Sequence, residues 1–456
     1  MHMKTKNLWQ SGALALSLMA SGVMAAVSPQ EAAKLGSSLS PVGAEVAGNA
    51  AGTIPAWTGG LPKSAGTVDS RGFLSDPFAN EQPLFVITAA NVEQYKDNLT
   101  PGQLAMFKRY PDTYRMPVYP SHRTASMPAS VMAAAKENAV NTILVEGGNG
   151  LENFNQANPF PIPQNGLEAI WNVITRYRGG SVSRIVAQAT PQANGSYSLV
   201  YFQDQFTFRD ALTDYDPNKS GNVLFYFKQR VTAPSRLAGN VLLVHETLNQ
   251  VKEPRLAWLY NAGQRRVRRA PQVSYDGPGT AADGLRTSDN FDMYNGAPDR
   301  YEWTLNGKKE IYIPYNAYKL DSPNLKYSDI IKAGHINQDL TRYELHRVWH
   351  VTGTLKDGER HIYAKRDFFI DEDTWQPALI DHYDGRGTLW RVAEAHAQYY
   401  YDKQVPWYTV ETLYDLLSGR YLALGMKNEE KQAYDFNYKA SSSDYTPAAL
   451  RQAGVR

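Results

Sequence analysis

A chain of 456 residues is long for one hydrophobic core, so we expect two or three lobes. The absence of cysteine excludes disulfides and thiolate metal sites, while 29 tyrosines favour sheets and binding surfaces. Without the predicted signal peptide, the 47 basic residues lose Lys4 and Lys6, and the remaining 45 face 45 acidic residues. This balance argues against nucleic acid as a partner.

The N-terminus has the pattern of a secretory signal peptide over residues 1–25. Two lysines precede an apolar run at 14–23, and Val23-Met24-Ala25 fits the small-residue rule before a cleavage site near Ala26. The run is too short to span a bilayer. We therefore expect an exported, soluble protein, and the lack of cysteine excludes the lipidation of a bacterial lipoprotein.

Residues 26–180 are predicted to form an N-terminal helical and irregular lobe. Ser28 is a good N-cap for a short first helix that ends by Gly36. The segment 39–83 is rich in Gly, Pro and Asn, but its aromatic residues favour an ordered strap over a linker. Cap and stop signals predict further helices over residues 88–99, 100–110, 130–143 and 167–177.

Alternating segments joined by short polar turns indicate an antiparallel meander over residues 181–402. The expected fold class is α+β: a large curved antiparallel β-sheet covered by helices. The break at 271–342 is too long for a hairpin, so we interpret it as an excursion that packs back as a lid or plug. After residue 403 we expect a C-terminal helix, capped by Thr409, and a polar tail to residue 456.

The stretch 255–273 is predicted to be the hairpin at the centre of this sheet. Its first arm alternates, and turn residues around Gly263 lead into a second arm with arginines on both faces. A strand with charge on both faces does not suit a closed sandwich. It suits an open, cupped half-barrel whose two faces are both partly wet.

Few patterns point to catalysis or to metal binding. His346 and His350 lie four residues apart in a predicted strand, which separates their imidazoles by roughly 13 Å, too far to share one ion. The acidic run 371–373 is interpreted as a solvated turn. Glu394 and His396 share a strand face, but nothing nearby in sequence supplies a nucleophile or an oxyanion donor. We therefore expect no enzyme, no metal site and no cofactor.

A concave sheet lined with aromatic residues describes a pocket for a hydrophobic molecule. The candidates for its lining are Leu256, Trp258, Tyr260, Phe225, Phe227 and Trp349. A basic rim that meets an acidic headgroup or a partner protein is predicted at Arg265, Arg266, Arg268 and Arg269. The alternative for these arginines is a solvated hairpin arm.

The hairpin sequence WLYNAGQRRVRRAP resembles a strand pair of outer membrane lipoprotein-sorting proteins of the LolA and LolB type. Long stretches at 39–61, 76–95, 160–179, 265–303 and 365–391 resemble one family in particular, the exported Gram-negative proteins classed as domain of unknown function 1329. This resemblance covers nearly all of the mature chain. The chain is more than twice the usual size of the sorting proteins, which puts a lipoprotein cargo in doubt.

The resemblance implies a half-barrel around a hydrophobic cavity, a periplasmic location, and association with an RND-type inner membrane exporter and an outer membrane protein. The leading hypothesis is therefore a periplasmic carrier or adaptor that binds a lipid-like molecule in the cupped sheet. One alternative is a structural adaptor whose cup is filled by its own 271–342 segment. Another is a lipid-acting hydrolase, which would need a nucleophile and base that the sequence does not show.

Overall fold

The structure, a computed structural model, describes residues 27–219, 221–270 and 273–454, so the predicted signal peptide lies outside the described residues. Its main feature is one 15-stranded sheet, which is antiparallel except for a single parallel pair between β12 and β2. The strands along the sheet are β1 (Phe85–Ile87), β2 (Met116–Val118), β12 (Tyr343–Leu355), β13 (Lys365–Asp371), β14 (Pro377–Tyr383), β15 (Leu389–Tyr400), β16 (Val405–Asp415), β17 (Tyr421–Met426), β5 (Ser181–Ala189), β6 (Leu199–Phe208), β7 (Val223–Ala233), β8 (Val241–Thr247), β9 (Leu256–Asn261) and β10 (Arg266–Arg269), with β11 (Tyr301–Pro314) paired to β12. A two-residue pair, β3 (Ile143–Leu144) and β4 (Leu151–Glu152), stands apart.

The predicted C-terminal helix is wrong, because residues 405–426 form β16 and β17. Every residue of both strands is buried. A strand buried on both faces carries no polar alternation, so its periodicity cannot be told from that of a buried helix. The correction matters because β17 pairs with β5 and thereby joins the strands of residues 343–426 to those of residues 181–270.

The hairpin of β9 and β10 lies at one end of the sheet and not at its centre. Its neighbour on the inner side is β8, and β10 has no further strand beyond it within the described residues. Charge on both faces is therefore explained by an edge position, where both faces and the outer edge reach water.

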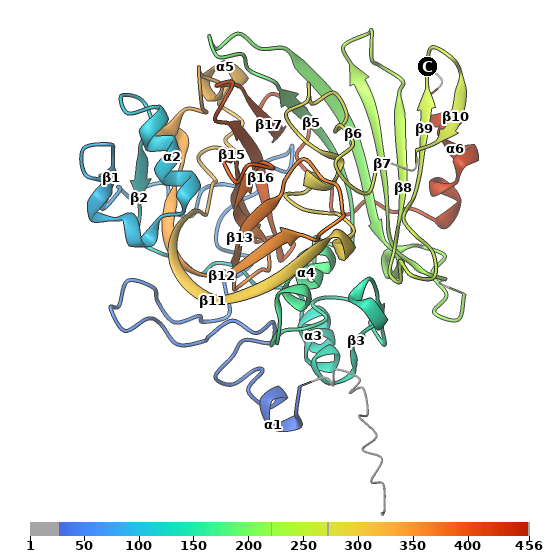
Figure 1. The fold of residues 1–456 in the computed structure, drawn as a ribbon, viewed down its shortest axis with the longest axis horizontal. Helices are drawn as coiled ribbons and strands as arrows, with labels where there is room; N and C mark the ends of the chain where they lie inside the picture. Colours follow the sequence, from blue (N-terminus) through green and yellow to red (C-terminus); the bar gives the residue numbers. More distant parts are fainter. Residues whose placement is uncertain (1–26, 220, 271–272, 455–456) are drawn as a thin grey trace, which may run out of the picture.

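The excursion at 271–342 contains a long strand that the sequence did not predict. β11 pairs with β12 along almost its full length, so this part is sheet and not lid. The preceding residues 274–297, here called the plug, have no strand and bury Leu285, Met293 and Tyr294 in the core that the sheet encloses. In Figure 1 this part of the chain, drawn in yellow, lies within the outline of the sheet, between the strands labelled β16 and β7.

Two helices, α3 and α4, lie beneath the strands at the lower end of the sheet in Figure 1. The N-terminal lobe has fewer helices than expected, since residues 88–99 form only two 3₁₀ turns, Val92–Gln94 and Lys96–Asn98. Residues 39–83 are an ordered strap, as predicted, with Phe73 only 3% exposed. No helix in the described ranges is long and apolar enough to cross a membrane. The helices are α1 (Pro29–Ala32), α2 (Pro101–Arg109), α3 (Ala129–Asn141), α4 (Gly166–Thr175), α5 (Tyr327–Ile330) and α6 (Pro447–Gly454).

The junction of β17 with β5 depends on Gly425, which lies at a register shift with φ at +100°. A Cβ there would be 2.5 Å from the carbonyl oxygen of Thr409. We expect Gly425→Ala to lower the free energy of unfolding by about 3–4 kcal/mol, from backbone strain together with overpacking. The measurement is chemical denaturation with two spectroscopic probes.

The matched control is Gly387→Ala, in the turn between β14 and β15. Gly387 also has positive φ, at +76°, but no atom lies within 4 Å of the place that a methyl group would take there. Strain alone should cost about 1–2 kcal/mol at this position. Equal losses for the two variants would contradict a close approach of β17 to the Thr409 carbonyl of β16.

Candidate ligand-binding site

The inner face of β6 and β7 presents a cluster of phenylalanines to the plug. Phe206 and Phe225 have ring centroids 4.7 Å apart, and Phe227 lies 4.5 Å from Phe291 of the plug. Phe225 and Phe227 are two residues apart, so the pleat points both side chains to the same face. This face of the sheet therefore presents aromatic rings to the plug.

A cavity of about 40 Å³ lies between the phenylalanines and the plug. Its wall is formed on one side by β7 and β8 and on the other by plug residues. The lining residues are Phe225, Phe227, Gln229, Leu242, Val244, Arg255, Val273, Gly279, Thr280, Arg286, Ser288, Phe291 and Asn295. The volume holds a few water molecules, so an alkyl chain could enter only if the plug moved.

Of the six predicted cavity residues, the structure brings only Phe225 and Phe227 to this cavity. Trp258 and Tyr260 lie on the opposite face of β9, where they pack with Leu450 of α6. Leu256 is two residues from Trp258 and therefore lies on the same face of β9, whereas Ala257 lies on the other face and belongs to the enclosed core. The prediction that Leu256, Trp258 and Tyr260 lie on the concave side is therefore wrong. Alternate residues of β9, such as Ala257, face that side instead.

Trp349 is also absent from the cavity wall. Its ring stacks on Trp375 with centroids 6.0 Å apart, and Lys308 lies 4.8 Å from its ring centroid. It packs against the edge of the enclosed core from β12. Trp349 is thus a packing residue between the sheet and the strap side of the molecule.

The plug is held by a buried carboxylate. Asp292 accepts hydrogen bonds from Arg178 and from the indole of Trp407 at 3.0 Å, and its other close contact is Arg176 at 2.8 Å. Burial of this carboxylate is outweighed by the two guanidinium groups, which lower the pKa of Asp292. Removing it would leave two buried cations without their counter-charge.

A second ionic anchor lies at the other end of the plug. Glu246 of β8 forms an ion pair with Arg255 at 2.5 Å and accepts a hydrogen bond from the Asn295 amide at 3.0 Å. Arg255 also donates to the backbone carbonyls of Val273 and Asn295, at 2.8 and 2.6 Å. The plug is therefore fixed to the sheet by charged and polar contacts as well as by the apolar packing of Leu285, Met293 and Tyr294. The sequence analysis did not predict a role for Arg176, Arg178 or Asp292. The one signal in the sequence that could have indicated it is the presence of charged residues beside apolar ones.

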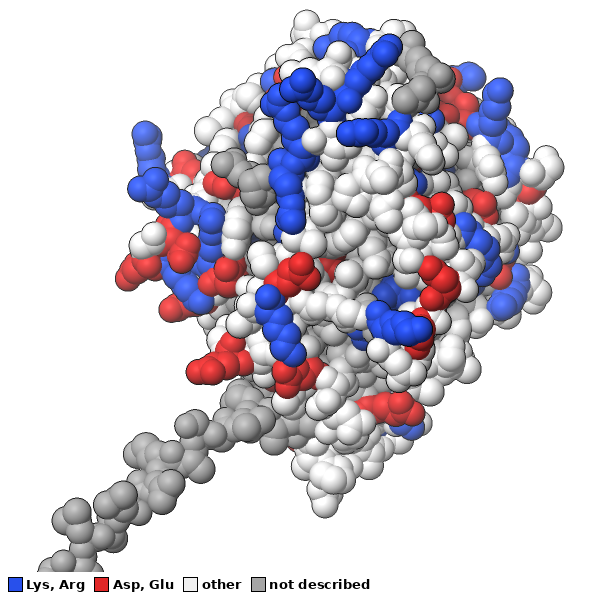
Figure 2. Space-filling model, turned by 90° about the vertical axis from the view of Figure 1, so that its right-hand side faces the viewer, with Lys and Arg blue, Asp and Glu red and all other residues white. Residues whose placement is uncertain are grey.

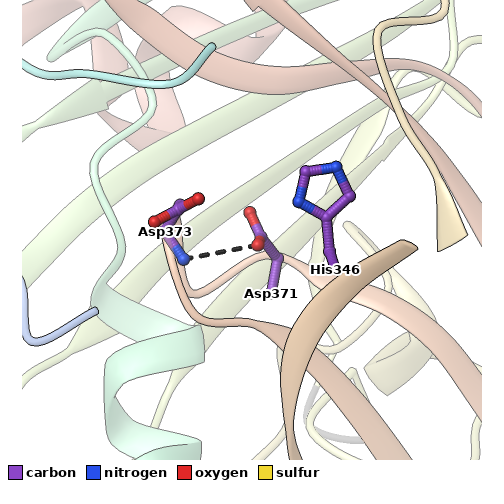
Figure 3. A group of neighbouring side chains, drawn as sticks. All are labelled: His346, Asp371 and Asp373. Carbon is purple, nitrogen blue, oxygen red and sulfur yellow. Dashed lines mark hydrogen bonds between the residues drawn. The ribbon is translucent and has the colours of Figure 1, made fainter. Parts of the chain in front are cut away.

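The acidic run 371–373 is buried, so its interpretation as a solvated turn is wrong. Asp371 and Asp373 face His346 of β12, as Figure 3 shows, and one ligand atom from each lies within 4.8 Å of the others. Burial and the neighbouring Asp373 raise the pKa of Asp371 to about 7. Each member is occupied by protein partners: Arg123 donates to both oxygens of Asp373, and the Nε2 of His346 lies 2.9 Å from Glu344.

These contacts describe a polar network that ties the strap to the sheet. Arg123 also donates to the carbonyl of Glu45 in the strap, at 2.7 Å. A cation would have to displace the guanidinium of Arg123 from Asp373. The donor atoms could approach a metal ion, but their protein partners already satisfy the carboxylates.

Glu394 and His396 form a second buried pair, with 3.7 Å between Nε2 and the carboxylate. Burial raises the pKa of Glu394 to about 7 and lowers that of His396 to about 3, so burial favours the neutral form of each. The hydroxyls of Tyr343 and Tyr114 donate to Glu394 at 3.2 and 3.4 Å. The pair is enclosed by aromatic side chains and does not line the cavity beside the plug.

The four arginines of the predicted basic rim are exposed. Between residues 223 and 270 the chain has nine basic and two acidic residues, and one of the two acids is the buried Glu246. Figure 2 shows Lys and Arg side chains gathered at the upper end of the face that carries β9, β10 and α6. Arg269 lies 5.2 Å from the ring centroid of Trp258, so part of this charge covers an aromatic surface.

The sequence model of a family described as protein of unknown function (DUF1329) matches residues 86–451. An uncharacterized protein of Pseudomonas aeruginosa is 82% identical over 452 residues, which are 99% of each chain. The chain belongs to the DUF1329 family. The resemblance inferred from the sequence is thereby confirmed.

Two solved structures resemble part of this chain. A putative outer membrane lipoprotein-sorting protein domain from Vibrio parahaemolyticus has a TM-score of 0.43 at 14% identity, covering 63% of this chain and 98% of its own. A DUF1329 family protein from Desulfovibrio piger has a TM-score of 0.40 at 14% identity, and the match covers 62% of this chain and 95% of that protein's chain.

The buried Glu394 predicts a pH-dependent effect. Its pKa is about 7 in the folded protein and 4.5 ordinarily, so ionisation costs stability as the pH rises from about 4.5 to 7. Glu394→Gln cannot ionise. Relative to wild type, its free energy of unfolding should therefore increase by about 2–3 kcal/mol between pH 5 and pH 8. Urea denaturation at both pH values measures this, and a pH-independent difference would contradict the raised pKa.

Proposed function

We propose that this protein is a periplasmic carrier that binds a hydrophobic, lipid-like molecule between the sheet and the plug. The observation that carries the proposal is the cavity between Phe225, Phe227 and the plug residue Phe291. Shielding apolar surface from water stabilises a bound ligand by about 25 cal/mol per Å². A phenylalanine face behind a removable segment offers that shielding without any chemical step.

The backbone conformation and the ionic contacts of the plug support the proposal that the plug can move. Four of its non-glycine residues, Ala281, Asp283, Asp292 and Met293, have φ between +50° and +64°, a region that costs free energy for such residues. Its anchors are buried ion pairs, whose net stabilisation is small because desolvation offsets the attraction. Such contacts define one closed position, and the apolar packing of Leu285, Met293 and Tyr294 is what must be broken for the plug to move.

The periplasmic location is proposed from the signal-peptide pattern at 1–25, and the working partners from the family resemblance. We propose an RND-type inner membrane transporter and an outer membrane protein as donor and acceptor of the ligand. The exposed arginines at 265–269 would suit an acidic surface on either partner. No catalytic role is part of this proposal.

A structural adaptor is the second candidate, because the cup is nearly full. The plug leaves only about 40 Å³ beside the phenylalanines. In an adaptor the plug would be a permanent part of the core. The two candidates therefore differ in whether a hydrophobic molecule can replace plug contacts.

Binding of a neutral hydrophobic fluorophore, N-phenyl-1-naphthylamine, distinguishes the two. We expect the wild type to bind it with enhanced emission, and Val244→Phe to weaken binding by at least tenfold because the added ring fills the cavity. Val244 is buried in the cavity wall. Overpacking should cost about 1–3 kcal/mol of stability, which thermal unfolding will check.

Leu259→Phe is the control, since Leu259 on the neighbouring strand β9 is 44% exposed and outside the cavity. It should bind the fluorophore as the wild type does. If the folded wild type binds no fluorophore at all, the carrier proposal fails and the adaptor stands. Equal loss in both variants would place the fluorophore elsewhere than beside the plug.

A further inference from the structure

One residue of the plug is charged, buried and without a polar partner. Arg286 is 4% exposed and lies in the cavity wall. Its Nε and Nη1 atoms are buried without a hydrogen-bond acceptor, and no ion pair involves this side chain in the part of the chain that the structure describes. The guanidinium lies 5.6 Å from the ring centroid of Phe291 and against Gly279, whose missing side chain leaves it room.

Two neighbouring carboxylates, Asp204 and Glu411, attract Arg286 through space, but within the described residues neither makes a hydrogen bond or an ion pair with it. Asp204 accepts from Arg184 at 3.1 Å and from the Gln229 amide at 3.0 Å. Glu411 accepts from the hydroxyl of Tyr408 at 3.1 Å. Burial raises the pKa of Glu411 to about 7, which weakens it further as a counter-charge.

A buried guanidinium without a partner is costly in a folded protein. The other buried arginines of the cup show the usual solution: Arg178 is paired with Asp292, Arg184 with Asp204, and Arg255 with Glu246. Arg286 differs from them in that it lines the cavity without an ion pair and that two of its buried nitrogens, Nε and Nη1, lack an acceptor. The missing partner is thus an acceptor that the chain itself does not supply.

We propose that Arg286 binds the anionic headgroup of the carried molecule, which makes the ligand class an acidic amphiphile with one alkyl chain or more. This inference rests on the proposed function and adds the headgroup to it. The planar guanidinium matches a carboxylate or a phosphate through paired hydrogen bonds. The alkyl chain would lie along Phe225, Phe227 and Val244 after the plug has shifted.

The assignment also explains why the charge is on the plug. A ligand that pairs with Arg286 supplies the missing hydrogen-bond acceptor of a plug residue. The free energy of ligand binding therefore depends on where the plug lies. The free protein keeps the unpaired charge against Phe291 and Gly279. An acidic ligand removes that penalty, whereas a neutral ligand of the same length does not.

The test compares charged and neutral ligands on wild type and Arg286→Gln by displacement of the naphthylamine fluorophore. The pairs are oleate with oleyl alcohol, and oleoyl lysophosphatidate with monoolein. We expect at least one acid to bind the wild type about tenfold or more tightly than its neutral counterpart, and this preference to vanish in Arg286→Gln. Which acid shows it tells a carboxylate from a phosphate headgroup.

Arg386→Gln, the same change of charge in an exposed turn, should keep the preference. A separate readout needs no ligand: Arg286→Met should raise the melting temperature, because it removes an unpaired buried charge. Arg255→Met should lower it, because Glu246 would lose its partner.

The outcomes separate the two proposals. If all four ligands fail to bind, the carrier function itself fails. If neutral and charged ligands bind equally, or Arg286→Gln retains the preference, the carrier function stands and the headgroup assignment is overturned. A lower melting temperature for Arg286→Met would show that the guanidinium has a stabilising partner and would also overturn it.

Discussion

The structure depends on how charge is buried inside the cup. Asp292 lies among apolar residues. Its burial is tolerated only because Arg176 and Arg178, in the segment between α4 and β5, form ion pairs with it. These contacts place the plug against the phenylalanines and leave a small cavity at their interface. The plug also buries Leu285, Met293 and Tyr294 in this core, so ionic and apolar contacts together define its position.

The sheet supplies the rigid side of this arrangement. β16 and β17 are buried on both faces and connect two series of antiparallel strands into one curved surface. The connection places Trp407 of β16 beside Asp292, so the strand that completes the sheet also holds the plug. At the far end the hairpin of β9 and β10 leaves arginines exposed on a free edge, where a partner can reach them.

Much of this fold follows from alternation in the sequence. The strands around Phe225 and Phe227 were predicted because apolar and polar residues alternate there, and that alternation also put both residues correctly on the inner face. The prediction was wrong where alternation carries no information. The strands at 405–415 and 421–426 are buried on both faces. In the β9 hairpin both faces are partly exposed to water, so alternation does not indicate which face Trp258 occupies. The contacts of Asp292 with Arg178 and Trp407 join residues more than 100 positions apart, which local patterns cannot reveal.

The central claim is that the plug can leave the cup while the sheet stays folded, and hydrogen exchange followed by mass spectrometry measures this most directly. Amides of residues 274–297 should exchange through a local opening, with a lower free energy than amides of β6, β7 and β16. A bound acidic amphiphile should change the exchange of the plug and leave those strands as they are. If plug and strands exchange together at the free energy of global unfolding, with or without ligand, the plug is permanent core and the account is contradicted.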